Sequence, residues 1–156
     1  MTTAGKRMAH DHYFIDDKFN AFADAARQGR IARFPLEDAI RRLRHHFWVE
    51  EEFVFPPLAH SNPGPVVVML RQHGVIWNHV EELEALLDAD DPDPELALAI
   101  FTALRQELDA HNLTEDNVLY PVADDVLGEE LAQATLNALA TEMPDGWRCS
   151  MADAKV

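Results

Sequence analysis

Two stretches of the sequence repeat a histidine that is followed four residues later by a glutamate. HHFWVE contains His46 and Glu50, and HNLTE contains His111 and Glu115. Side chains four residues apart lie on the same face of an α-helix, so each pair can present an imidazole and a carboxylate to one point. These groups are among the ligands that iron, manganese and zinc accept in proteins. The two pairs therefore suggest a metal site built from two helices.

Two single histidines interrupt apolar stripes elsewhere in the chain. His12 precedes Ile15 at helical spacing, and His73 lies between Met69 and Ile76. Burying an unpaired carboxylate costs several kcal/mol, and imidazole also resists burial, so inward polar groups must satisfy one another or bind a cation. We favour a buried site for two metal ions, with two bridging carboxylates and four terminal imidazoles; a hydrogen-bonded polar core is the alternative. The predicted ligands are His12, His46, Glu50, His73, His111 and Glu115.

The other histidines fit this site less well. His45 is rotated away from the stripe that carries His46, so we expect it to orient a ligand or lie at the surface, with an exchange of roles with His46 as the alternative. His79 follows His73 by six residues, which is out of helical phase, and is expected to flank the site. His10 and His60 are expected at the surface.

Three further side chains have simpler interpretations. Asp16 lies one turn after His12 and could orient it or reach a metal ion, although a solvent-side acid is the interpretation we favour. Cys149 is the single cysteine, which excludes a disulfide framework or a cysteine-based cluster and predicts an ordinary free thiol in a polar tail. Trp77 is expected in the core.

Apolar residues recur at three-and-four spacing in four stretches, as amphipathic helices require. These stretches cover approximately residues 10–28, 35–55, 66–88 and 94–120, and a shorter amphipathic piece covers 129–140. Four helices with short connections and one apolar stripe each predict an all-α, up-down-up-down four-helix bundle with a short C-terminal extra helix. We expect a bundle domain over residues 1–140 and a tail over 141–156.

Prolines mark two of the predicted helix ends. Pro56 and Pro57 are expected to end the second helix, because neither ring can donate to the helical hydrogen-bond ladder. Pro121 leaves the end of the fourth helix open, since a proline can bend a helix as well as stop it. The tail is expected either to pack over one end of the bundle or to stay loose.

The composition narrows the class of protein. The chain has 156 residues, with 28 acidic and 13 basic side chains and a formal net charge of -15, while 47% of its residues are hydrophobic. This length and hydrophobic fraction predict one folded domain. The acidic balance disfavours nucleic acid, because phosphate binding needs clustered Lys and Arg. No apolar run is long enough to span a membrane and the first residues have no signal-peptide core, so we expect a cytoplasmic protein.

Segments around the predicted ligands resemble the hemerythrin-like family, also called the HHE cation-binding domain. These segments are DHYFIDDKF, HFWVEEEFVFP, MLRQH and HNLTEDNVLYPVAD, which follow one another within residues 8–127. Two His-x-x-x-Glu motifs, each followed by an aromatic–proline ending, make the resemblance specific. It implies a four-helix bundle with a non-haem di-iron site. The implied terminal ligands are His12, His46, His73 and His111, and the implied bridges are Glu50 and Glu115.

The resemblance also implies reaction with O2, NO or peroxide, because a small ligand needs an open position on the metal. The oxygen carriers of the family place two histidines one turn apart on the third helix, and here Trp77 stands where the second is expected. His79 could replace it only if that helix were distorted. One metal ion is then more open, which favours sensing, scavenging or iron handling over reversible O2 transport.

Three alternatives to this function stay open at the level of sequence. One is a di-iron enzyme such as a peroxidase or oxidase, and another is an iron donor in the repair of iron–sulfur clusters. The third is a non-redox bundle that holds zinc or no metal and binds a protein partner. Manganese or zinc is also an alternative to iron in the site itself.

Overall fold

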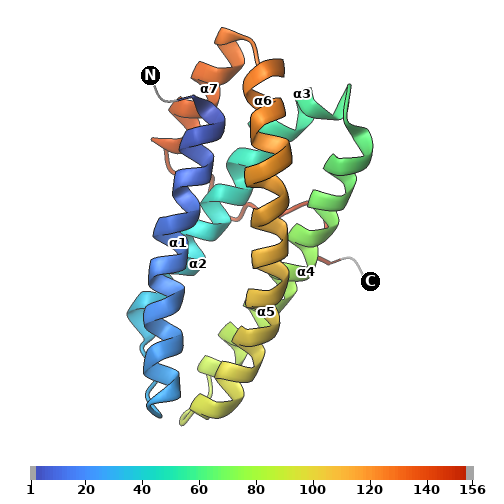
Figure 1. Ribbon diagram of the computed structural model, residues 1–156. Helices are drawn as coiled ribbons and strands as arrows, with labels where there is room; N and C mark the ends of the chain where they lie inside the picture. The colour runs from blue at the N-terminus through green and yellow to red at the C-terminus, as the bar shows by residue number, and fades with distance from the viewer. Residues whose placement is uncertain (1–2, 154–156) are drawn as a thin grey trace.

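The computed structural model describes residues 3–153, and every regular element in that range is helical. Figure 1 shows four long helices that alternate in direction, with α1 packed beside α2 and α5, and α4 beside α5. The predicted all-α bundle with a short extra helix is therefore confirmed. The long helices are α1 (Ala4–Arg27), α2 (Arg33–Val49), α4 (Pro63–Leu87) and α5 (Pro94–Thr114), and the extra helix is α7 (Glu129–Leu139).

Local signals set the ends of α1. The helix begins at Ala4 and not near residue 10, because the hydroxyl oxygen of Thr3 accepts a hydrogen bond from the Lys6 N–H and caps the first turn. Met8 is fully buried and extends the apolar stripe toward this start. Gly29 follows the helix with a φ of 79°, a conformation that glycine adopts without strain. The helix therefore ends at Arg27, close to the end that the apolar pattern predicted.

The second helical rod continues through Pro56–Pro57, so the expectation that it ends there was wrong. After α2 the backbone widens into a π-helical turn, η1 (Glu50–Val54), and continues as α3 (Phe55–Ala59). The N–H of Phe55 bonds to the carbonyl of Glu50, one residue further back than in an α-helix. The two prolines then occupy the first turn of α3, where their missing N–H groups are not needed.

The fourth helical rod contains a π-helical turn of the same kind. α5 passes into a second π-helical turn, η2 (Glu115–Leu119), and continues as α6 (Tyr120–Val126), with Pro121 again in the first turn after the widening. Both π turns begin at a glutamate that the sequence assigns to the site. Such turns are rare and often mark functional sites, because they change the direction in which side chains leave the helix.

Two apolar clusters lie on either side of the predicted ligands along the bundle. Burial of each large apolar side chain contributes about 1.5–3 kcal/mol, so these clusters fix the spacing of the helices around the polar residues between them. The larger cluster includes Phe19, Phe22, Leu43, Leu83 and Leu104, and the smaller one includes Val54, Leu58, Met69 and Leu119.

The chain after α7 returns across the side of the bundle and finishes beside α4 (Figure 1). Cys149 is only 3% exposed there, and burial raises the pKa of its thiol to about 12, so it is not the ordinary tail thiol that the sequence suggested. The first two residues of the predicted 1–140 domain and the last three of the predicted 141–156 tail lie outside the described range. Within residues 3–153, no helix is both long and apolar enough to cross a membrane.

Candidate metal centre

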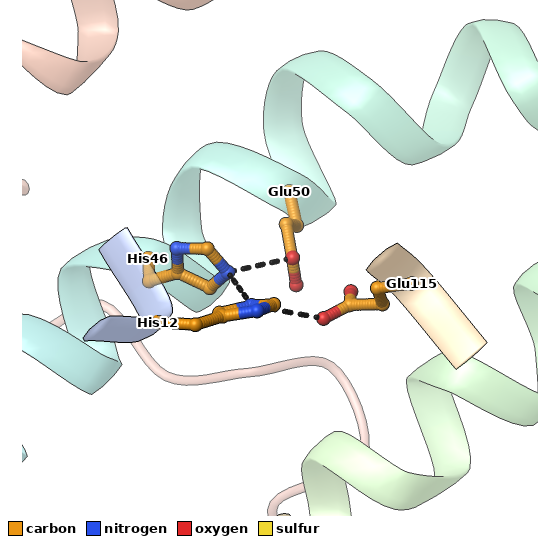
Figure 2. Close-up of side chains that lie close together, drawn as sticks. All are labelled: His12, His46, Glu50 and Glu115. Carbon is orange, nitrogen blue, oxygen red and sulfur yellow. Dashed lines mark hydrogen bonds and ion pairs between the residues drawn. The ribbon is translucent and has the colours of Figure 1, made fainter. Parts of the chain in front are cut away.

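All six residues that the sequence assigned to a metal site come together at one level of the bundle. They form two groups of four, and in each group the donor atoms lie within 4.8 Å of one another. Both groups contain Glu50 and Glu115. The first group adds His12 and His46, which Figure 2 shows, and the second adds His73 and His111.

In the first group, both imidazoles turn their Nε2 atoms toward the carboxylates. The Nε2 atom of His46 lies 2.8 Å from Glu50 Oε1, and the Nε2 atom of His12 lies 3.4 Å from Glu115 Oε1. The two Nε2 atoms are 3.1 Å apart, and Figure 2 marks this contact with a dashed line. Four donors from α1, α2, η1 and η2 therefore meet at one point.

In the second group the same two glutamates face a second pair of imidazoles. The Nε2 atom of His73 lies 2.9 Å from Glu50 Oε2, and the Nε2 atom of His111 lies 3.2 Å from Glu115 Oε1. Glu50 thus turns one oxygen toward His46 and the other toward His73. A carboxylate placed in this way can serve two neighbouring cations.

The outer nitrogen of each imidazole lies near a polar side chain, which is hydrogen-bonded to the ring of His46, His73 and His111 and only close to the ring of His12. Such partners fix the orientation of a metal-binding histidine and increase its basicity. The Nδ1 distances are 3.1 Å from His12 to Asp116, 3.4 Å from His46 to Asp11, 3.2 Å from His73 to Glu51 and 2.9 Å from His111 to Gln72.

The acidic neighbours favour a positive charge in the first group. Burial lowers the pKa of His12, but Asp116 and Glu115 outweigh this effect and raise the pKa to about 9. Burial also opposes protonation of His46, yet the charge of Glu50 helps to raise the pKa of His46 well above its usual value. A bound metal ion would take the place of these protons.

The second group has the same electrostatic character. Burial lowers the pKa of His73, but contacts with Glu50 and Glu51 outweigh it and raise the pKa to about 9. Burial raises the pKa of Glu50, and the charge of His46 more than reverses this and holds that pKa well below its ordinary value. Both groups therefore share an ionised Glu50 next to cationic partners.

Glu115 shows most directly that these residues fit a cation. It is fully buried, and within residues 3–153 neither of its carboxylate oxygens has a hydrogen-bond partner. The Nε2 atom of His111 is also without one, although it faces this carboxylate. His12 approaches this carboxylate to 3.4 Å without a hydrogen bond, so the cost of burying the charge is incompletely compensated. A metal ion between these atoms would satisfy both residues.

Tyr120 is a site residue that the sequence analysis missed. Its hydroxyl donates a hydrogen bond to Glu50 Oε1 and lies 3.0 Å from the Nε2 atom of His46 and 3.3 Å from that of His12. Burial and the nearby charges of Glu115 and Glu50 raise the pKa of Tyr120 well above its usual value, so the phenol stays protonated. The signal was the LYP ending, which places an aromatic residue directly after the second π turn.

The remaining candidates lie outside the two groups. Asp16 approaches Arg105 at 3.4 Å, while the carboxylate at His12 Nδ1 comes from Asp116. His45 lies close to the backbone oxygen of Thr141, at 2.7 Å. His10 and His60 are exposed, His79 is partly exposed near Glu82, and Trp77 is buried as expected.

The fold and these donors define a class of protein: a helical bundle whose facing helices supply histidine and glutamate to a cation site. The family model described as the hemerythrin HHE cation binding domain matches residues 3–123. The chain therefore belongs to the hemerythrin HHE cation-binding family, as the sequence segments implied. No curated protein and no solved structure matches the chain.

Proposed function

We propose that this protein binds two non-haem iron ions and that the pair reacts with O2, NO or peroxide. The observation that carries the proposal is that two groups of four donors share both Glu50 and Glu115. In this assignment the two glutamates bridge the ions. His12 and His46 would complete the ligands of one ion, and His73 and His111 would complete those of the other.

The donor set supports iron and an open position. Imidazole and carboxylate without thiolate suit iron, and they also accept manganese or zinc. Each ion receives four protein donors in this assignment, two imidazoles and two carboxylate oxygens. Iron commonly takes more ligands than four, so a small molecule can occupy a remaining position. A ferrous pair supplies electrons to an oxygen-derived ligand.

The surrounding residues suit a small reactive ligand. Tyr120 keeps its hydroxyl proton beside His12 and His46 and donates it to Glu50, so it orients a carboxylate of the centre on this side. His12 is the most exposed of the four inward histidines, at 5%, and its partner Asp116 has a side chain that is 40% exposed. Solvent and small ligands therefore approach the centre most closely on this side.

The experiment is anaerobic loading with Fe(II), followed by separate additions of O2, NO and hydrogen peroxide while the near-ultraviolet and visible spectrum is recorded. We expect a rapid spectral change with at least one of the three, and no change in protein loaded with Zn(II). One reaction for each iron pair supports sensing or scavenging, whereas repeated turnover of peroxide identifies an enzyme. An iron-loaded protein that responds to none of the three contradicts the proposal.

A cytoplasmic location is part of the same proposal. The free, buried thiol of Cys149 suits a reducing compartment, where disulfides rarely form. Fractionation of the native cells with an antibody against this chain tests it, and recovery outside the cytoplasm contradicts it.

A further inference from the structure

Residues 141–153, which we call the strap, pack across the side of the bundle next to the metal centre. Cys149 and Ala152 are each 3% exposed, so the strap is anchored by buried side chains. The ring of Trp147 meets the ring of Trp77 on α4 edge to face, with 5.8 Å between centroids. The family match ends at residue 123, so the strap lies outside it.

One carboxylate joins the strap to a metal-centre histidine. The backbone N–H of Ser150 donates to Glu51 Oε2 at 3.0 Å, and the Ser150 hydroxyl donates to Glu51 Oε1 at 3.3 Å. The same Oε1 atom lies 3.2 Å from Nδ1 of His73, whose Nε2 atom faces Glu50. The strap, Glu51 and His73 therefore form a continuous hydrogen-bonded chain that ends at the centre.

The helix that carries His73 is shaped to receive the strap. Gly74 is the next residue, and a Cβ atom added there would lie 2.5 Å from the carbonyl oxygen of Met151 and 2.8 Å from its Cβ atom. Real Cβ atoms do not approach so closely, so only glycine lets the strap close on this turn of α4. The strap thus contacts both Glu51, the outer partner of His73, and Gly74, the residue that follows His73 in the helix.

The other three inward histidines lack this dependence. Their outer partners Asp116, Asp11 and Gln72 belong to the helical rods, and among the described contacts only the partner of His73 is itself held by residues 141–153. The two halves of the centre are therefore supported differently, one by the bundle alone and one by the bundle and the strap.

We propose that the strap positions His73 through Glu51, so that closure of the strap and metal binding at the His73–His111 group stabilise each other. This inference rests on the proposed function, because it assigns His73 to a metal ion. Coupling between two sites is reciprocal: if a closed strap strengthens metal binding, bound metal must keep the strap closed to the same extent.

Cys149 reports strap opening directly, because it is the single cysteine and lies buried within the strap. The measurement is the rate of alkylation by iodoacetamide under nitrogen, followed by mass spectrometry, with and without Fe(II). We expect Fe(II) to slow alkylation by about tenfold or more, equal to the factor by which strap closure raises metal affinity. Equal rates with and without bound Fe(II) would overturn the coupling.

Two neighbouring glutamates provide a matched pair of variants. Glu51→Ala removes the link, and we expect faster alkylation and a Kd for Fe(II) that rises about 10- to 100-fold, the range typical for loss of a residue that orients a metal ligand. Glu52→Ala removes only the exposed contact with Trp147 Nε1 at 3.2 Å, which touches the strap but not His73. We expect it to change both quantities less than about twofold.

Gly74→Ala tests the link without altering Glu51 or a ligand. Alanine favours the helix, so α4 itself is preserved, as circular dichroism can verify. We expect faster alkylation together with weaker Fe(II) binding. Faster alkylation in Glu51→Ala and Gly74→Ala with unchanged iron affinity overturns the proposal and leaves the strap as a simple cover. If the wild-type chain binds no Fe(II), the proposed function fails. Faster alkylation in Glu51→Ala than in Glu52→Ala would then show only that Glu51 holds the strap closed.

Discussion

Two segments of the chain enter the metal centre with the same pattern. In residues 46–56 and in residues 111–121, a histidine is followed by a glutamate, then an aromatic residue, then a proline. Both segments pass from an α-helix into a π turn at the glutamate and back into an α-helix at the aromatic residue. The backbone therefore delivers an equivalent set of side chains from two sides of the bundle.

The aromatic residue makes the two segments different. In the second segment it is Tyr120, whose hydroxyl reaches Glu50 and the pair His12 and His46. In the first it is Phe55, whose ring lies 5.4 Å from the ring of His73.

A second phenylalanine reinforces the difference. Phe47 stacks on His73 with 3.7 Å between centroids. The His12–His46 side of the centre thus faces the Tyr120 hydroxyl and lies closest to solvent, while on the other side the fully buried His73 packs between the rings of Phe47 and Phe55 and its polar partners. The same π-helical turn therefore occurs in two different environments. The hydroxyl of Tyr120, which Phe55 lacks, accounts for much of the difference.

The largest expected effect is the loss of bound metal when either of the two shared glutamates is removed. We expect Glu50→Ala and Glu115→Ala each to lose most of the bound metal, because each carboxylate belongs to both donor groups. His60→Ala, at an exposed position away from the groups, is the control and is expected to retain its metal. Metal content by mass spectrometry measures this. Equal content in all three variants would refute the assigned ligands.

A smaller effect is the pH dependence of stability in the metal-free protein, where one histidine on each side of the centre is protonated. The pKa values of His12 and His73 are raised from 6.5 to about 9 in the folded state. Their stabilising contribution is therefore complete below pH 6.5 and is lost as the pH rises through about 9. We expect the metal-free protein to lose at least about 1.4 kcal/mol for each imidazole over this interval.

Thermal unfolding at pH 6.5 and at pH 9.5 measures this loss. The iron-loaded protein is the control. Its metal-bound imidazoles are already neutral, so a rise in pH does not discharge them, and we expect its stability to fall less. A metal-free protein that unfolds at the same temperature at both pH values contradicts the assigned protonation.

The smallest effect comes from exchanging the two aromatic residues one at a time. Tyr120→Phe removes the hydrogen bond to Glu50 and is expected to lower the free energy of unfolding by about 1 kcal/mol. Phe55→Tyr adds a hydroxyl at the equivalent position of the first segment, where the ring packs beside the ring of His73. We expect this variant to be neutral within about 0.5 kcal/mol. Denaturant unfolding measures the free energy of unfolding of both variants. A larger loss in Phe55→Tyr than in Tyr120→Phe would contradict the expected difference between the two aromatic positions.

The sequence predicted the bundle, and the six polar residues that it assigned to one site lie close together, because both features depend on local periodicity. His46 and Glu50 share a helix face whatever their surroundings, and an apolar stripe identifies the face that turns inward. The same reasoning failed at Pro56–Pro57, because proline rules apply to an α-helix and the backbone there is a π turn that needs no bond from those residues.

Long-range contacts were beyond such reasoning. The contact between Ser150 and Glu51 joins residues far apart in the chain, and nothing near either one signals it. Tyr120 belongs to the aromatic–proline ending of the second motif, but only the fold brings its hydroxyl across to Glu50. The metal-ligand roles themselves stay predictions that rest on proximity and chemistry.

The most direct test of the central claim is the metal content of the wild-type chain, measured by mass spectrometry after anaerobic loading with Fe(II) and removal of unbound metal. We expect two iron ions for each chain, one for each group of donors that shares Glu50 and Glu115. One ion, or none, would contradict it and would mean that the inward histidines and glutamates do not form a paired site.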